Sequence, residues 1–100
     1  MTSILGRLVS TDDEDFPGWA RVRVDRADGT AVEVHDKQPV IGLGAEVPGD
    51  SVCLDCEVLE IDTGGSVTVR LLHGMATTDG HEILTVQRAR LLEAGTQARS

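Results

Sequence analysis

The chain has 100 residues, of which 17 are acidic and 9 are Lys or Arg, so its net charge is −8. Proteins bind nucleic acid mainly through Lys and Arg at the phosphates, and those that bind single strands add aromatic side chains, which make up 2% of this chain. The composition therefore predicts no nucleic-acid partner. A basic partner protein or a neutral small molecule fits this charge better, although an acidic surface also serves solubility alone.

The length predicts one domain over residues 1–100, with the last few residues frayed. Its core should be aliphatic, because Phe16 and Trp19 are the only Phe and Trp and there is no Tyr. No N-terminal segment has the charged-then-apolar pattern of a signal peptide, and no apolar run approaches the ~18 residues that span a membrane. We therefore expect a cytoplasmic protein with no membrane contact.

Residues 4–9 have the pattern of a first β-strand, in which Gly6 marks a bulge or a close backbone approach. Residues 10–18 contain several turn formers and the acidic run, which consists of Asp12, Asp13, Glu14 and Asp15. Four consecutive carboxylates are not tolerated inside a strand, so the strand should end in an acidic loop.

Residues 19–37 are typical of one β-hairpin, because apolar residues recur at every second position between charged ones. A two-residue turn at Asp28 and Gly29 would set Val24 against Glu33, on a face where apolar residues should meet. A three-residue loop over residues 27–29 removes this conflict, with Gly29 in the left-handed conformation. Its register pairs Trp19 with Lys37, Arg21 with His35, Val22 with Val34, Arg23 with Glu33 and Val24 with Val32. One face of the hairpin is then aliphatic, and the other carries complementary charge.

Prolines and glycines interrupt residues 38–50, so only a short edge strand at Val40 and Ile41 is expected there. Residues 52–61 form the next strand, and their apolar parity changes after Val58, which predicts a β-bulge near Val58 and Leu59. A turn at residues 63–65 leads into a strand over residues 66–72, with Glu57 opposite Arg70.

Residues 73–80 are predicted to be a loop, and the segment after it is compatible with two structures. Helical spacing of apolar residues from Ile83 to Leu92, followed by Gly95, would suit a helix over residues 81–95. The β-branched residues near Ile83 favour a strand at 82–87 and a helical turn at 88–94, which we expect. Short strands with closely spaced turns predict an all-β fold: a small, partly open barrel of SH3-like or OB-like character with five or six antiparallel strands.

Cys53 and Cys56 have the spacing of a zinc or redox pair. On a strand, however, residues three apart lie about 10 Å apart on opposite faces, too far for a disulfide or for one tetrahedral zinc. We therefore predict one buried and one exposed thiol, and no metal.

His73 and His81 flank a loop with Thr77, Thr78 and Asp79, and a His/Asp or Cys/His constellation is conceivable there. The sequence has no serine in a nucleophile-elbow context and no glycine-rich phosphate cradle before a helix. Function has to be argued from a site. We therefore expect a protein that is not an enzyme and needs no cofactor.

Two surface features are candidates for partner binding. The acidic run could dock on a basic groove or chelate calcium, but it lacks the spaced ligands of an EF-hand, and a solvated loop is the simpler interpretation. The outer hairpin face combines aromatic, cationic and acidic residues, namely Trp19, Arg21, Arg23, Glu33, His35 and Lys37. Trp beside Arg is the composition of protein interfaces. Equally, Lys37 or Arg21 could cover an indole that caps the barrel.

The leading functional hypothesis is a small protein-binding or accessory module, in its sharpest form one with inhibitor- or immunity-type action on a basic partner. The alternative is a small molecule bound in the mouth of the barrel. An apolar pocket of roughly 300 Å³ or more with convergent polar groups would favour the ligand. A flat acidic face would favour the partner.

Overall fold

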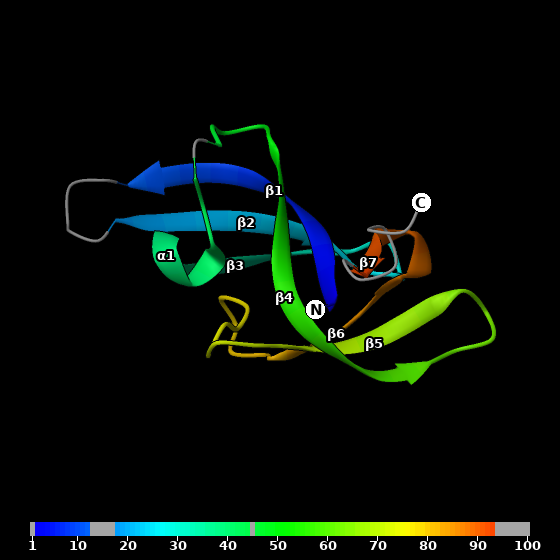
Figure 1. Ribbon diagram of the computed structural model, residues 1–100. Coiled ribbons are helices and arrows are strands. Elements are labelled where there is room, and N and C mark those ends of the chain that lie inside the picture. Colours follow the sequence, from blue (N-terminus) through cyan, green and yellow to red (C-terminus); the bar gives the residue numbers. More distant parts are fainter. Residues whose placement is uncertain (1, 13–17, 45, 94–100) are drawn as a thin grey trace.

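The computed structural model describes residues 2–12, 18–44 and 46–93 (Figure 1). The elements in chain order are β1 (Thr2–Asp12), β2 (Trp19–Asp25), β3 (Ala31–Lys37), α1 (Gln38–Ile41), β4 (Ser51–Ile61), β5 (Ser66–Leu71), β6 (Ile83–Gln87), the 3-10 turn η1 (Arg88–Arg90) and β7 (Leu91–Glu93). The prediction of an all-β fold is confirmed, as is the order of a strand and a short helical turn after residue 82. The helix considered for residues 81–95 does not form over the described part of that segment.

The β2–β3 hairpin has the predicted register, from Trp19 opposite Lys37 to Val24 opposite Val32. Arg26 N donates to Thr30 O at 2.7 Å, and Gly29 N donates to Arg26 O at 3.1 Å, so the loop has the expected three residues. Gly29 has a φ of 91°, the left-handed conformation that favours glycine.

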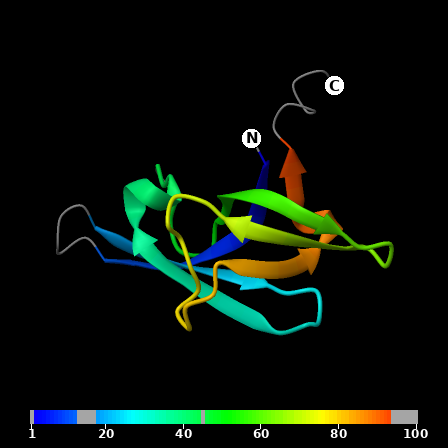
Figure 2. The ribbon, with the colours of Figure 1, turned by 90° about the horizontal axis from the view of Figure 1, so that it is seen from below.

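The sheet has the strand order β3-β2-β1-β4-β5-β6, with β7 paired to β1. It curls, so β3 and β6 at the two ends of this order come close to each other (Figure 2). Ala27 N donates to Thr85 O at 2.9 Å, and Thr78 N donates to Glu33 O at 2.8 Å. These isolated hydrogen bonds stand where a closed barrel would have a continuous ladder, and the barrel is therefore partly open.

β1 is the central strand and pairs with three others. One edge pairs with β4 over residues 2–7. The other edge pairs first with β7 over residues 2–4 and then with β2 from Arg7 onward. Leu5 and Gly6 therefore lie where β7 and β2 part. The pairing with β7 was not predicted, because three residues are too short a segment for a strand pattern to be recognised.

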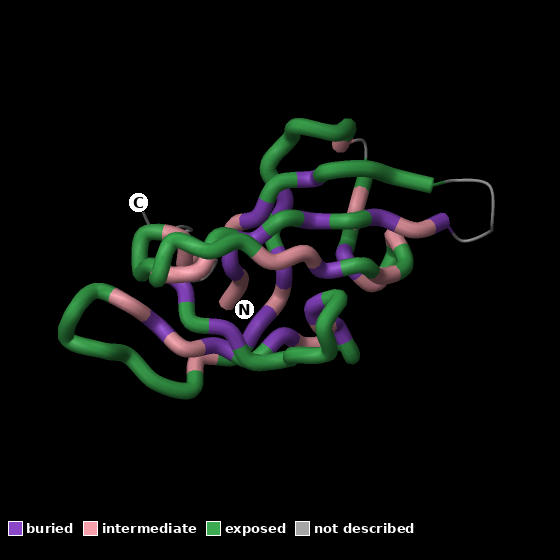
Figure 3. The backbone as a smooth tube through the Cα atoms, turned by 180° about the vertical axis from the view of Figure 1, so that it is seen from behind, coloured by how far each residue is buried: buried purple, intermediate pink, exposed green. Residues whose placement is uncertain are grey.

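The core is aliphatic, as expected, and lies on the inner face of the curled sheet (Figure 3). It contains Ile4, Leu8, Ala20, Val22, Val24, Val34, Ile41, Val52, Leu54, Cys56, Val67, Val69, Leu71, Met75, Leu84 and Val86. Met75 is fully buried although it belongs to the predicted loop of residues 73–80, and Thr77 in the same loop is 5% exposed. The loop therefore packs as part of the fold.

Three predicted elements have the wrong bounds or type. The helical turn expected over residues 88–94 ends at Arg90, and residues 91–93 form β7 instead. β1 does not end at Val9 but continues to Asp12, because Thr11 and Asp12 pair with the start of β2. Val40 and Ile41 are not an edge strand but belong to α1. Pro39 stands in the first turn of α1, where its missing N–H and fixed φ suit a helix start.

The β-bulge predicted near Val58 and Leu59 is confirmed, since the β4–β5 register shifts between Val58 and Glu60. It places Ile61 opposite the buried Val67, and Glu57 opposite Arg70 as predicted. Ile61 is nevertheless 55% exposed, and Leu59 in the bulge is 43% exposed. In the described residues, no helix has the length and apolar character needed to cross a membrane.

Gly6 provides a test of this packing. A Cβ added there would lie 2.7 Å from Val22 Cγ1 and 3.0 Å from Arg23 O, so the predicted close backbone approach is confirmed, whereas the irregularity of β1 lies between Leu8 and Ser10. We expect Gly6→Ala to lower the free energy of unfolding by about 1–3 kcal/mol, the usual cost of overpacking. Gly44→Ala is the control, because the nearest atom to its added Cβ is 3.9 Å away. Equal denaturant midpoints for the two variants would contradict this account of β1.

Candidate functional site

The outer face of the β2–β3 hairpin brings together the six residues predicted from the sequence. Trp19, Arg21 and Arg23 alternate along β2, and Glu33, His35 and Lys37 stand opposite them on β3. Arg21 Nε lies 3.4 Å from Glu33 Oε1. Both side chains are more than a third exposed, so this ion pair contributes little stability.

Trp19 is partly buried on this face and does not belong to the core. Its ring centroid lies 5.2 Å from that of His35, with the planes tilted by 47°. Gln38 Nε2 donates to the Trp19 carbonyl oxygen at 3.2 Å and connects α1 to the start of β2. The aromatic partner is therefore His35, whereas the sequence suggested Lys37 or Arg21 above the indole.

The acidic run is only partly covered by the structure. Asp12 is the last residue of β1 and stands opposite Trp19, so it belongs to a strand and not to the predicted loop. Asp13, Glu14 and Asp15 lie outside the described residues.

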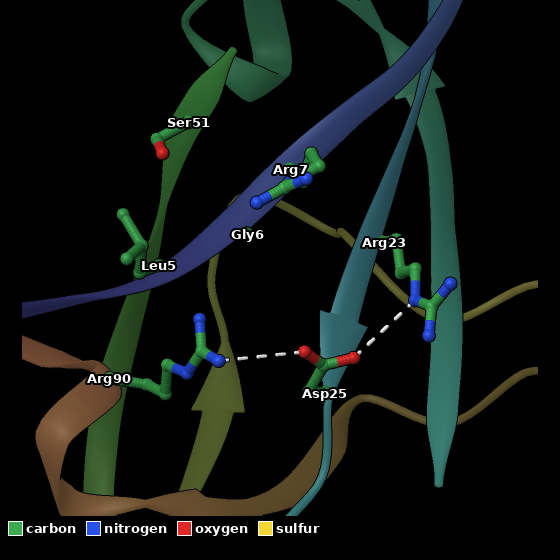
Figure 4. Close-up of a pocket in the computed structure, with 7 residues that line it drawn as sticks. All are labelled: Leu5, Gly6, Arg7, Arg23, Asp25, Ser51 and Arg90. Atoms are coloured by element: carbon green, nitrogen blue, oxygen red, sulfur yellow. Dashed lines mark hydrogen bonds and ion pairs between the residues drawn. The ribbon is translucent and has the colours of Figure 1, made fainter. Parts of the chain in front are cut away.

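A polar cavity of about 320 Å³ opens on the outer side of β1 (Figure 4). Three arginines and one aspartate line it, Arg7, Arg23, Arg90 and Asp25, together with Leu5, Gly6 and Ser51. We call it the arginine pocket. It lies where β2 and β7 part beside β1, so the split of the sheet edge creates the space.

Asp25 holds two arginines of this pocket. Its Oδ1 lies 3.4 Å from Arg23 Nε, and its Oδ2 lies 3.6 Å from an Arg90 guanidinium nitrogen. Figure 4 shows Arg7 on β1 above the gap between Arg90 and Asp25. Arg7 stands directly opposite Arg23 in the β1–β2 register, although like charges at such positions are destabilising.

Sequence reasoning found only Arg23 of this pocket. Arg7, Asp25 and Arg90 were missed because they come from the first strand, the end of the second and a turn near the C-terminus. Their meeting depends on β1 pairing with both β2 and β7. The β-pattern of residues 4–9 shows that Arg7 faces outward, but it does not show which residues lie beside it.

The two cysteines lie as predicted, with Cys56 buried and Cys53 exposed, and neither forms a disulfide. Burial raises the pKa of the Cys56 thiol to about 11, and the neighbouring Asp55 carboxylate adds to this. In the described residues, no three side chains of His, Cys, Asp and Glu are grouped to hold a metal ion.

The two histidines of the 73–81 segment do not form one site. His73 Nε2 lies 2.9 Å from Asp55 Oδ2 on β4, whereas His81 Nε2 lies 3.7 Å from Asp79 Oδ2. The Thr77 hydroxyl donates to Asp79 Oδ1 and accepts from His81 N at 3.0 Å. A nucleophilic hydroxyl would instead donate to the histidine, so these contacts brace the turn.

Comparison with known proteins finds no match: no family model, no curated protein and no solved structure resembles the chain. Its function therefore has to be argued from the geometry of these surfaces.

The burial of Cys56 predicts a difference in reactivity between the two thiols. In the native protein at pH 8, we expect Ellman's reagent to react quickly with Cys53 alone, because a buried thiol with a raised pKa is almost entirely protonated. Cys53→Ser should abolish the fast native reaction, and Cys56→Ser should preserve it. Rapid reaction of the Cys53→Ser variant would contradict the burial of Cys56.

The Thr77–Asp79 contact predicts a dependence of stability on pH. The hydrogen bond from the Thr77 hydroxyl holds the pKa of Asp79 below its ordinary value. A hydrogen bond from the backbone of Asp79 itself and the charges of His81 and Arg26 make smaller contributions in the same direction. A carboxyl whose pKa is lowered by folding stabilises the protein above its unfolded pKa of about 3.9, and this stability is lost as the pH falls through the folded pKa. Asp79→Asn should therefore reduce the free energy of unfolding more at pH 7 than at pH 3. Denaturant titrations in a Thr77→Val background provide the control, where this difference should shrink.

Proposed function

We propose that this protein is a small protein-binding module that contacts its partner through the outer face of the β2–β3 hairpin. The observation that carries the proposal is the position of Trp19. A large aromatic side chain lies among charged residues, in contact with His35 and outside the aliphatic core. Trp and Arg are the residues most enriched at positions that dominate binding free energy.

The same face would provide orientation as well as affinity. Arg21, Arg23 and Lys37 provide cations, and Glu33 provides a carboxylate. Paired strands hold the backbone of these residues in register, so little backbone order would have to be gained on binding. This supports a preformed interface.

The charge of the whole chain supports a basic partner. A net charge of −8 would steer a basic protein toward the module, since long-range fields act on encounter before contacts form. The outer hairpin face itself, with three cations and one carboxylate, would then contact acidic groups of that partner. Inhibitor- or immunity-type action on such a partner is the sharpest form of this proposal.

A ligand in the barrel mouth is the weaker alternative. Aliphatic side chains fill the inner face of the sheet, among them Ile4, Val22 and Val69, each 0% exposed. The arginine pocket reaches the volume expected of a ligand site, but its wall is polar and it lies on the outer side of β1. We therefore favour the protein partner.

Trp19→Ala tests the proposal. We expect the variant to lose about 2 kcal/mol or more of binding free energy toward a partner captured from the native host, while its free energy of unfolding changes by less than about 1 kcal/mol. Ile83→Ala is the matched control, because Ile83 is a large apolar residue that is 53% exposed and belongs to β6, not to the outer hairpin face.

Affinity is measured by calorimetry with the purified partner, and stability by denaturant titration. If Trp19 serves the core, Trp19→Ala would instead destabilise the protein by about 3–5 kcal/mol. Equal loss of affinity in the Ile83 variant would also contradict the proposed face.

A further inference from the structure

We infer that the arginine pocket is a binding site for the phosphate group of a small phosphomonoester. This inference does not depend on the proposed protein partner. It rests on three features of the pocket: its net charge, the cross-strand pairing of Arg7 with Arg23 in its wall and the composition of that wall.

The first feature is local charge. Arg7, Arg23 and Arg90 bring three positive charges to the pocket, and Asp25 brings one negative charge, so two positive charges remain. A phosphomonoester carries −1.5 to −2 charges at neutral pH, which would neutralise this excess. The excess is notable because the whole chain has a net charge of −8.

The second feature is the opposition of Arg7 and Arg23. Two like charges directly across a strand pair destabilise the sheet, and a single Asp25 contacts Arg23 and Arg90 but not Arg7. Among the described residues, Arg7 makes no ion pair. A bound dianion would satisfy Arg7 and relieve its repulsion from Arg23.

The third feature is the chemistry of the wall. Each guanidinium has five N–H donors, and each contact with Asp25 uses a single nitrogen, so donors remain on Arg23 and Arg90 as well as on Arg7. The three free oxygens of a phosphomonoester accept such donors, and Arg is the residue that binds phosphate in a bidentate manner.

The size of the site indicates a small ligand. A volume of about 320 Å³ lies at the lower end of the range for small-molecule sites. Among the described residues of the wall, Leu5 is the only large apolar one, so these residues offer little with which to bind the side chains of a phosphopeptide.

The test uses the full chain labelled with ¹⁵N and titrated with inorganic phosphate and glycerol 3-phosphate at constant ionic strength. We expect saturable shifts of the Leu5 and Gly6 amide signals with a dissociation constant in the millimolar range or below. Arg7→Gln should weaken binding at least tenfold. Arg70→Gln is the control. It removes the same charge from β5, at a residue that forms an ion pair with Glu57 on β4, and it should change binding less than twofold.

Arg7→Gln should also unfold at the same denaturant concentration as the wild type or a higher one, because it removes the repulsion with Arg23. Arg90→Gln provides a second loss-of-binding variant if Arg7→Gln does not fold. The inference is overturned if the shifts do not saturate, if Arg70→Gln weakens binding as much as Arg7→Gln, or if succinate binds as tightly as phosphate. Binding of a phosphopeptide a hundredfold tighter than glycerol 3-phosphate would overturn the assignment to a small molecule.

Discussion

The pairing of β1 with three strands is the constraint on which the rest of this structure depends. β4 occupies one edge, and β7 and β2 follow one another along the other. The sheet built on β1 curls, and its aliphatic face becomes the interior. Gly6 lies at the point of departure, where a side chain would meet Val22.

The two candidate surfaces follow from this arrangement and share one residue. Arg23 belongs to the outer hairpin face through its pairing with Glu33 on β3, and to the arginine pocket through its pairing with Arg7 on β1. Both surfaces lie on the outer side of a sheet whose inner side is filled. A ligand or partner at either surface would therefore meet paired strands and polar side chains, without displacing the core.

The net charge of the whole chain and the net charge of the arginine pocket have opposite signs. Acidic residues outnumber basic ones by 17 to 9, which favours basic partners at long range. Within the arginine pocket the balance is reversed, with three arginines around one aspartate. Long-range steering and local recognition are thus separate properties here, and an overall charge says little about a pocket only a few residues wide.

The sequence by itself determined the local structure of this protein. The alternating valines of residues 19–37 specify which face is buried, and a shift of one residue would turn Val22 and Val34 to solvent, so the hairpin register was predictable. The parity change after Val58 revealed the bulge in the same way. The geometry of a strand likewise separated Cys53 from Cys56.

Only the tertiary structure decided which distant segments meet. The three residues of β7 are too few to show an alternating pattern, so the pairing of β7 with β1 could not be predicted from the sequence. Arg7 and Arg90 are far apart in the chain, so the arginine pocket could not be predicted from local patterns either. Pro39 suits both a loop and a helix start, and the burial of Ile41 against the core favours the helical turn. Local patterns determine which face of a segment is buried. Long-range packing decides what that face contacts, because many different strands could pair with a segment of alternating apolar and polar residues.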